Sequence, residues 1–255
     1  MANGTEKFLA RHTTASLFTL LQKSRAVVAL VPVGSTEPHG PHLGLGTDVV
    51  ISAAACVRAV ELLEKKGPLT AVIAPAISYG VTECAAGFPG AVSIPAPVLT
   101  SYIAAVCDGL LAQGFRHVCL VNNHLEPDHD AAVRAVLDGR DKKVSYACPL
   151  TKRWAKTLSA EFKSGACHAG QYETSIVMAA APELVDEGMR ATLAQVPISL
   201  SEKLKAGVTT FTQMGMELAY SGNPAGASVE EGEQMIQRLA EMVVGEVREA
   251  IGLPA

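Results

Sequence analysis

The sequence has few features of a disulfide-stabilised or nucleic-acid-binding protein. Its six cysteines lie far apart, none in a Cys-x-x-Cys pair, and several sit in apolar runs where cysteine behaves as a small buried hydrophobe. This pattern is typical of a reducing compartment. Lysine and arginine are scattered rather than clustered, and the formal net charge is -4. We therefore expect no nucleic-acid or anionic-membrane partner and favour a small-molecule substrate.

Long hydrophobic runs are also absent. The apolar stretch 26–34 is too short to span a bilayer and too far from the start to be the core of a signal peptide. The sequence therefore predicts a cytoplasmic protein without a membrane partner.

A sizeable hydrophobic core is present. The chain has 255 residues, of which 49% are hydrophobic and 18% charged, so we expect one α/β domain over residues 1–255. Continuous apolarity predicts buried strands at residues 26–34, 70–77, 117–122 and 143–147. Helical patterns cover residues 49–66, 100–113, 128–137, 172–181 and 229–251. The alternation predicts a mostly parallel sheet covered by helices on both faces, with residues 200–224 as a loop beside a pocket or a subunit contact.

Polar residues follow the first predicted strand, where ligands bind in such sheets. A glycine- and proline-rich segment places Glu37 and His39 two residues apart, so both can project to one side of an extended chain. Asp48 closes the segment just before a helix. We interpret these three residues as candidate metal ligands.

The third predicted strand repeats this arrangement, with His124 and Glu126 again two residues apart. Five oxygen and nitrogen ligands exceed what one ion with an open position needs, whereas two ions that share a carboxylate would use them all. Asp48 is the unpaired member and our expected bridge. A mixed set without thiolate suits Zn²⁺, Mn²⁺ or Fe²⁺.

A third cluster places His168 in a loop of small residues before a helix. An imidazole in such a loop is suited to proton transfer near neutral pH, and Glu173 could orient it or cap the helix. Cys167 is adjacent, but a bystander thiol is the favoured interpretation.

The other histidines have weaker support. His42 is a possible ligand, although bracing the loop is the favoured role. Asp128 is a natural helix N-terminal residue, which leaves His129 facing solvent. His12 and His117 lack supporting neighbours, and we expect both at the surface.

These segments together resemble the creatininase, or creatinine amidohydrolase, family. The resemblance rests on Gly-Ser-x-Glu-x-His-Gly-x-His from Gly34, an aspartate nine residues after His39, and Asn-x-His from Asn122. It further includes His-x-Gly-x-x-Glu-Thr-Ser from His168, and Gly-Phe-Pro-Gly from Gly87 followed by a serine. These motifs occur in order over roughly residues 32–185.

The resemblance implies a three-layer α/β/α fold, a dinuclear metal centre, hydrolysis of a non-peptide C–N bond that is often in a cyclic amide, and commonly a homohexamer. By position, Glu37 and His124 would hold one metal, His39 and Glu126 the other, and Asp48 would bridge them. Glu126 and His168 are the expected catalytic residues, His168 as the proton-transfer histidine.

Departures from the family pattern bear on the substrate. Creatininase has tryptophans near the positions of Pro149 and Ser164 that close over creatinine, whereas the only tryptophan here is Trp154. We therefore expect a metal-dependent amidohydrolase for another, lactam-like substrate. The alternatives are a lactonase or formamide hydrolase, a peptide-trimming metalloprotease, and a non-catalytic metal-dependent binding protein.

Overall fold

A parallel β-sheet forms the centre of the molecule. The computed structural model describes residues 6–24, 26–65 and 69–254. Its four strands are β1 (Ala26–Val33), β2 (Leu69–Ile73), β3 (His117–Asn122) and β4 (Val144–Ala147). They pair in the order β2-β1-β3-β4, and every pair is parallel. The strands predicted from continuous apolarity are thus present.

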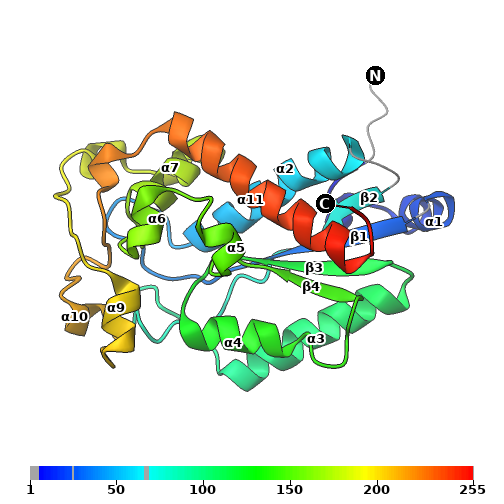
Figure 1. Ribbon diagram of the computed structural model, residues 1–255, viewed down its shortest axis with the longest axis horizontal. Coiled ribbons are helices and arrows are strands. Elements are labelled where there is room, and N and C mark those ends of the chain that lie inside the picture. Colours follow the sequence, from blue (N-terminus) through cyan, green and yellow to red (C-terminus); the bar gives the residue numbers. More distant parts are fainter. Residues whose placement is uncertain (1–5, 25, 66–68, 255) are drawn as a thin grey trace.

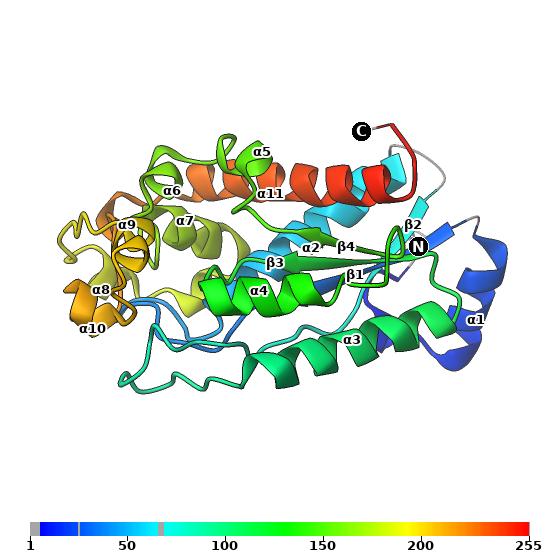
Figure 2. The same ribbon diagram turned by 60° about the horizontal axis from the view of Figure 1, so that its bottom comes forward.

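Helices cover both faces of this sheet. Alternate residues of β1 separate the two cores: Val28 and Leu30 contact one cluster, while Val27 and Ala29 contact the other. The first face is covered by α2 (Thr47–Lys65), α7 (Gln171–Ala180) and α11 (Val229–Ala250). The second is covered by α1 (Thr14–Lys23), α3 (Ala96–Ala112) and α4 (Pro127–Ala135). Figure 2 shows α11 and α3 on opposite sides of the strands, which confirms the predicted three-layer α/β/α fold.

Prolines explain where two elements differ from prediction. The expected strand 70–77 ends at Ile73, since Pro75 has no N–H to continue the ladder, and Ile77 meets Val33 only as an isolated bridge. Helix α3 begins at Ala96, earlier than the expected residue 100, because Pro97 lies in its first turn, where a missing N–H costs no hydrogen bond.

Short helices gather at one end of the sheet. They are α5 (Lys152–Ala155), α6 (Ala160–Ser164), α8 (Glu187–Arg190), α9 (Leu200–Lys205) and α10 (Phe211–Met214). Single 3₁₀ turns occur at Leu9–Arg11, Pro182–Leu184 and Pro224–Gly226. Figure 1 places α6, α9 and α10 at the end of the molecule opposite α1. Two of these helices lie in the predicted loop 200–224, which is therefore partly helical.

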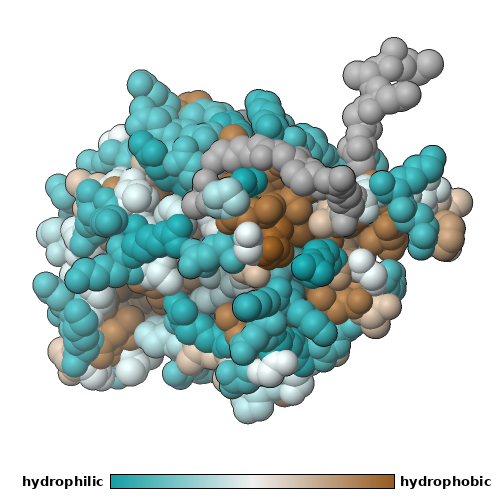
Figure 3. All heavy atoms as spheres, turned by 45° about the vertical axis from the view of Figure 1, so that its right-hand side comes forward, coloured by the Kyte–Doolittle hydropathy of each residue, from teal (hydrophilic) through white to brown (hydrophobic). Residues whose placement is uncertain are grey.

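None of the helices within the described residues is long and apolar enough to cross a membrane. The face in Figure 3 is mostly hydrophilic, with hydrophobic areas between the hydrophilic ones.

Candidate metal centre

The loop after β1 brings three predicted ligands together. Glu37 and His39 lie in this loop and Asp48 lies in the first turn of α2, and all three side chains are buried. The loop packs tightly on the helix at Gly34, where an added Cβ would come within 2.7 Å of Asp48 Cβ. The N–H of Ser35 donates to Asp48 Oδ2 at 3.2 Å and holds the carboxylate beside the loop.

Glu37, Asp48 and His124 form a first group of three possible ligands. His124 Nδ1 lies 3.3 Å from Glu37 Oε1 and 3.0 Å from Asp48 Oδ2. Its Nε2 lies 2.7 Å from the Val81 carbonyl oxygen, which can only accept, so Nε2 carries a proton and Nδ1 faces the carboxylates. Burial lowers the pKa of His124, but the charges of the two carboxylates outweigh this effect and raise the pKa well above its ordinary value.

His39, Asp48 and Glu173 form a second group. His39 Nε2 lies 3.2 Å from Asp48 Oδ1 and 3.6 Å from Glu173 Oε2. Its Nδ1 donates to the Glu37 carbonyl oxygen at 3.0 Å. Burial raises the pKa of Glu173 to about 8, whereas the carboxylates outweigh burial at His39 and raise its pKa to about 10. Asp48 is shared by both groups, and each of its oxygens faces a different imidazole.

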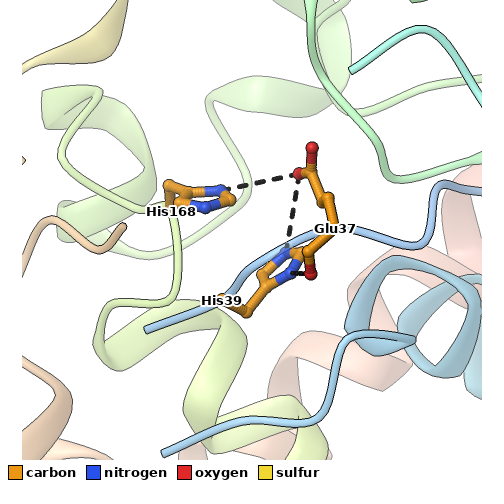
Figure 4. Close-up of side chains that lie close together, drawn as sticks. All are labelled: Glu37, His39 and His168. Atoms are coloured by element: carbon orange, nitrogen blue, oxygen red, sulfur yellow. Dashed lines mark hydrogen bonds and ion pairs between the residues drawn. The ribbon is translucent and has the colours of Figure 1, made fainter. Parts of the chain in front are cut away.

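His168 completes the inner wall of the site. Its Nε2 donates to the Pro38 carbonyl oxygen at 3.0 Å, and its Nδ1 faces Glu37 Oε1 at 3.9 Å (Figure 4). The His168 ring lies 4.5 Å, between centroids, from the rings of His39 and Phe211. Burial and the neighbouring His39 lower the pKa of His168 to about 4, so its Nδ1 is a free proton acceptor at neutral pH.

Glu126 lies in the same cavity but outside these groups of three. Its Oε1 accepts from the Glu83 N–H at 2.9 Å and its Oε2 from the Cys84 N–H at 3.0 Å. Burial raises its pKa. The structure thus brings Glu37, His39, Asp48 and His124 together as predicted, adds Glu173 to them, and holds Glu126 on a neighbouring loop.

No sequence pattern indicates a role for that neighbouring loop, Val81–Cys84. The Val81 carbonyl oxygen accepts from His124, and the Val81 N–H donates to His129. Thr82 Oγ1 donates to Glu37 Oε2. The N–H groups of Glu83 and Cys84 donate to Glu126. Most of these contacts use backbone atoms, which leave no residue pattern to recognise. The sequence feature that comes closest to indicating this loop is Ser93 in the family-like segment after Gly87, because its hydroxyl accepts from the Thr82 N–H at 3.0 Å.

Three of the four remaining histidines are buried. His42 donates to or accepts from Thr174 Oγ1 at 2.9 Å and lies outside the described ligand groups, which matches its favoured bracing role. The expectation that His129 and His117 are exposed is wrong, since both are buried. His129 contacts Asn122 Oδ1 at 3.1 Å, and His117 contacts Ser145 Oγ at 2.8 Å. Each ring fills a polar position inside the fold.

A cavity of about 190 Å³ opens beside the candidate ligands. Its polar wall includes Glu37, Asp48, His124 and Glu126, and its apolar wall is formed by Leu125, Leu150, Phe162, Leu200, Leu204 and Phe211. Cys167 also lines it, but burial raises the pKa of this thiol well above its ordinary value, which disfavours a thiolate nucleophile. The predicted loop 200–224 therefore does border a pocket.

Sequence comparisons place this site in a known family. The family described as creatininase, creatinine amidohydrolase, matches residues 12–247. The chain is 32% identical over 228 residues to a mycofactocin precursor peptide peptidase of Mycolicibacterium smegmatis, covering 87% of this chain and 83% of that one. It is 28% identical over 180 residues to a creatinine amidohydrolase of Pseudomonas putida, covering 62% of this chain and 66% of that one.

Solved structures agree on the fold. A creatinine amidohydrolase (creatininase) structure aligns with a TM-score of 0.72 at 20% identity, over 99% of this chain and 100% of that one. A structure described as creatininase Mn aligns with a TM-score of 0.68 at 22% identity, over 96% and 99% of the two chains. Together with the match over residues 12–247, these findings show that the chain belongs to the creatininase (creatinine amidohydrolase) family.

Proposed function

We propose that this protein is a metal-dependent amidohydrolase with two divalent ions per chain. The observation that carries the proposal is the position of Asp48, whose Oδ1 faces His39 and whose Oδ2 faces His124. A carboxylate that serves two adjacent ligand groups is what a dinuclear centre requires.

The chemistry of the donor set fits such ions. His39 Nε2 is buried without a hydrogen-bond partner among the described residues. Among the described residues, Glu37, Asp48 and Glu173 form ion pairs only with histidines. A bound cation would compensate these buried carboxylates in place of the protons that they draw onto His39 and His124. Oxygen and imidazole donors without thiolate favour Zn²⁺, Mn²⁺ or Fe²⁺.

We assign Glu37, Asp48 and His124 to one ion and His39, Asp48 and Glu173 to the other. Glu126, the second-site ligand expected from the family resemblance, competes with Glu173 for this role. Its two oxygens already accept the N–H groups of the Val81–Cys84 loop. These bonds hold the Glu126 carboxylate on the neighbouring loop, outside the groups of three possible ligands. We therefore propose that it exchanges protons with the substrate instead.

Two ions in this site would lower the pKa of a water molecule to about 7 and polarise a carbonyl group. The chain's own residues would then handle protons and orientation. His168 can accept a proton at Nδ1 and pass it to the leaving nitrogen, while its Nε2–H, bound to Pro38, fixes the ring. The apolar wall of the cavity would exclude bulk water and hold the non-reacting part of the substrate.

Two substrate classes follow from different observations. A small cyclic amide other than creatinine fits the cavity volume and the absence of the expected tryptophans. A peptide bond is favoured by the relatives named mycofactocin precursor peptide peptidase. We also propose a homo-oligomer, with a hexamer expected, and a cytoplasmic location, which light scattering and cell fractionation would test.

The decisive experiment combines metal analysis of the purified protein with hydrolysis of a substrate panel. The panel contains lactams, cyclic ureas, formamides, lactones and short peptides, each assayed before and after chelation. We expect about two ions per chain and hydrolysis that chelation abolishes and added metal restores. Asp48→Asn should lose both metal binding and turnover. Absence of metal and of metal-restored activity would support a binding protein instead.

A further inference from the structure

Asn123 presents an unused hydrogen-bond acceptor beside the candidate metal centre. The residue is buried, and it lines the cavity together with Asp48 and His124. Its Nδ2 donates to Ser52 Oγ at 2.9 Å. Its Oδ1 is buried and has no hydrogen-bond partner among the residues that the structure describes.

The hydrogen-bond chain behind Asn123 fixes which end of the amide faces Ser52. The Val33 carbonyl oxygen can only accept, and Ser52 Oγ donates its single hydrogen to it at 2.7 Å. Ser52 Oγ must therefore accept from Asn123 Nδ2. Rotating the amide by 180° would place Oδ1 against an oxygen that has no hydrogen left to offer. Asn123 Oδ1 is consequently oriented away from Ser52.

The neighbouring Asn122 shows the contrast. Its Nδ2 donates to the His124 carbonyl oxygen and to Tyr146, and its Oδ1 accepts from the His124 N–H and from His129. Asn122 is fully used in shaping the loop. A buried acceptor without a donor is costly, so Asn123 Oδ1 calls for a donor that the described residues do not supply. The residue lines the cavity, which is where such a donor can come from.

We propose that Asn123 Oδ1 accepts a hydrogen bond from the N–H of the substrate's amide, and that the substrate is a secondary amide. The inference rests on the proposed function and narrows its substrate class. Hydrolysis joins a water oxygen to the carbonyl carbon, breaks the C–N bond and delivers one water hydrogen to the nitrogen. The nitrogen keeps its original N–H throughout, so the acceptor can hold it from substrate to product amine.

The same contact would discriminate against esters. An ester or lactone places an oxygen where the amide has N–H, and two acceptors would then face each other. Asn123 alone would therefore favour amide hydrolysis over the alternative lactonase activity. It applies equally to a lactam and to a peptide bond, because both carry the N–H.

The test compares matched substrates in the metal-loaded wild type and in Asn123→Leu, which has a similar shape and no acceptor. The pairs are 2-piperidone with δ-valerolactone, and alanyl-alanine with alanyl-lactate. We expect Asn123→Leu to lower kcat/KM about tenfold for the amide member of the pair that is hydrolysed, with metal content unchanged. Turnover of the ester member should not fall, because the acceptor that opposed its oxygen has been removed. Ser52→Ala, which frees the amide to rotate, should cause a smaller loss in the same direction and serves if Asn123→Leu does not fold.

Each other result contradicts the inference in a distinguishable way. Equal losses on amide and ester, or loss of metal, would mean that Asn123 supports the metal centre rather than the substrate. No change on either substrate, or hydrolysis of esters alone by the wild type, would also overturn it. Hydrolysis of neither class would refute the proposed function itself, and the inference with it.

Discussion

Replacing Thr82 by valine tests whether the Val81–Cys84 loop positions the metal ligands. Thr82 Oγ1 donates to Glu37 Oε2, while Glu37 Oε1 faces His124, His39 and His168. Valine has nearly the same shape but no hydroxyl, so Glu37 would lose the contact that fixes its orientation. Loss of such an outer contact to a ligand typically costs about 10- to 100-fold in metal affinity or activity. This range corresponds to about 1.4–2.7 kcal/mol.

The assay is a chelator competition that measures the metal dissociation constant, run beside steady-state kinetics. Thr82→Ser should recover most of the affinity, because it restores the hydroxyl. Thr36→Val is a matched control, since Thr36 Oγ1 donates to the Ser78 carbonyl oxygen at 2.7 Å and contacts no carboxylate of the site. Metal affinity that is unchanged in Thr82→Val, or reduced equally in Thr36→Val, would refute the positioning role.

Three further predictions concern single residues. His168→Asn should keep the metal content but lower kcat about 10²- to 10⁴-fold, and a normal kcat would exclude His168 from proton transfer. Glu126→Gln should also retain two ions while turnover falls, whereas loss of one ion would show that Glu126 is a ligand. For His117, burial lowers the pKa below 6.5, so the unfolded chain binds a proton before the folded chain does. The wild-type free energy of unfolding should therefore decline as the pH falls from about 7 to 5, by at most about 1.4 kcal/mol per pH unit from this group. His117→Gln should reduce that slope in denaturant titrations, and an unchanged slope would contradict the assignment.

The fold and the position of the site could be predicted because they follow from local patterns. Buried parallel strands have continuous apolar sequences, and Glu37 and His124 each follow one of them. Since the carboxyl ends of parallel strands meet at one edge, these residues had to lie close together. Asp48 joined them because a carboxylate in the first turn of α2 faces the same edge.

The details that could not be predicted depend on pairing between distant segments. Glu126 follows His124 by two residues, which suggested a shared direction, but N–H groups more than forty residues away hold its carboxylate. Glu173 is brought to His39 by the packing of α7, which no local spacing specifies. His117 is buried because Ser145 on the adjacent strand supplies a partner for its ring.

The Val81–Cys84 loop also has a consequence for how this site can vary among relatives. Three of its four residues hold His124, His129 and Glu126 through N–H or carbonyl groups, which nearly every amino acid offers. Substitutions at positions 81, 83 and 84 can therefore keep these backbone contacts, provided that proline, which has no N–H, is avoided and that positions 81 and 84 stay apolar for their buried packing. A single inserted or deleted residue would instead misalign Glu37, His124 and Glu126 at once. The length of this segment should be constrained more strongly than its composition.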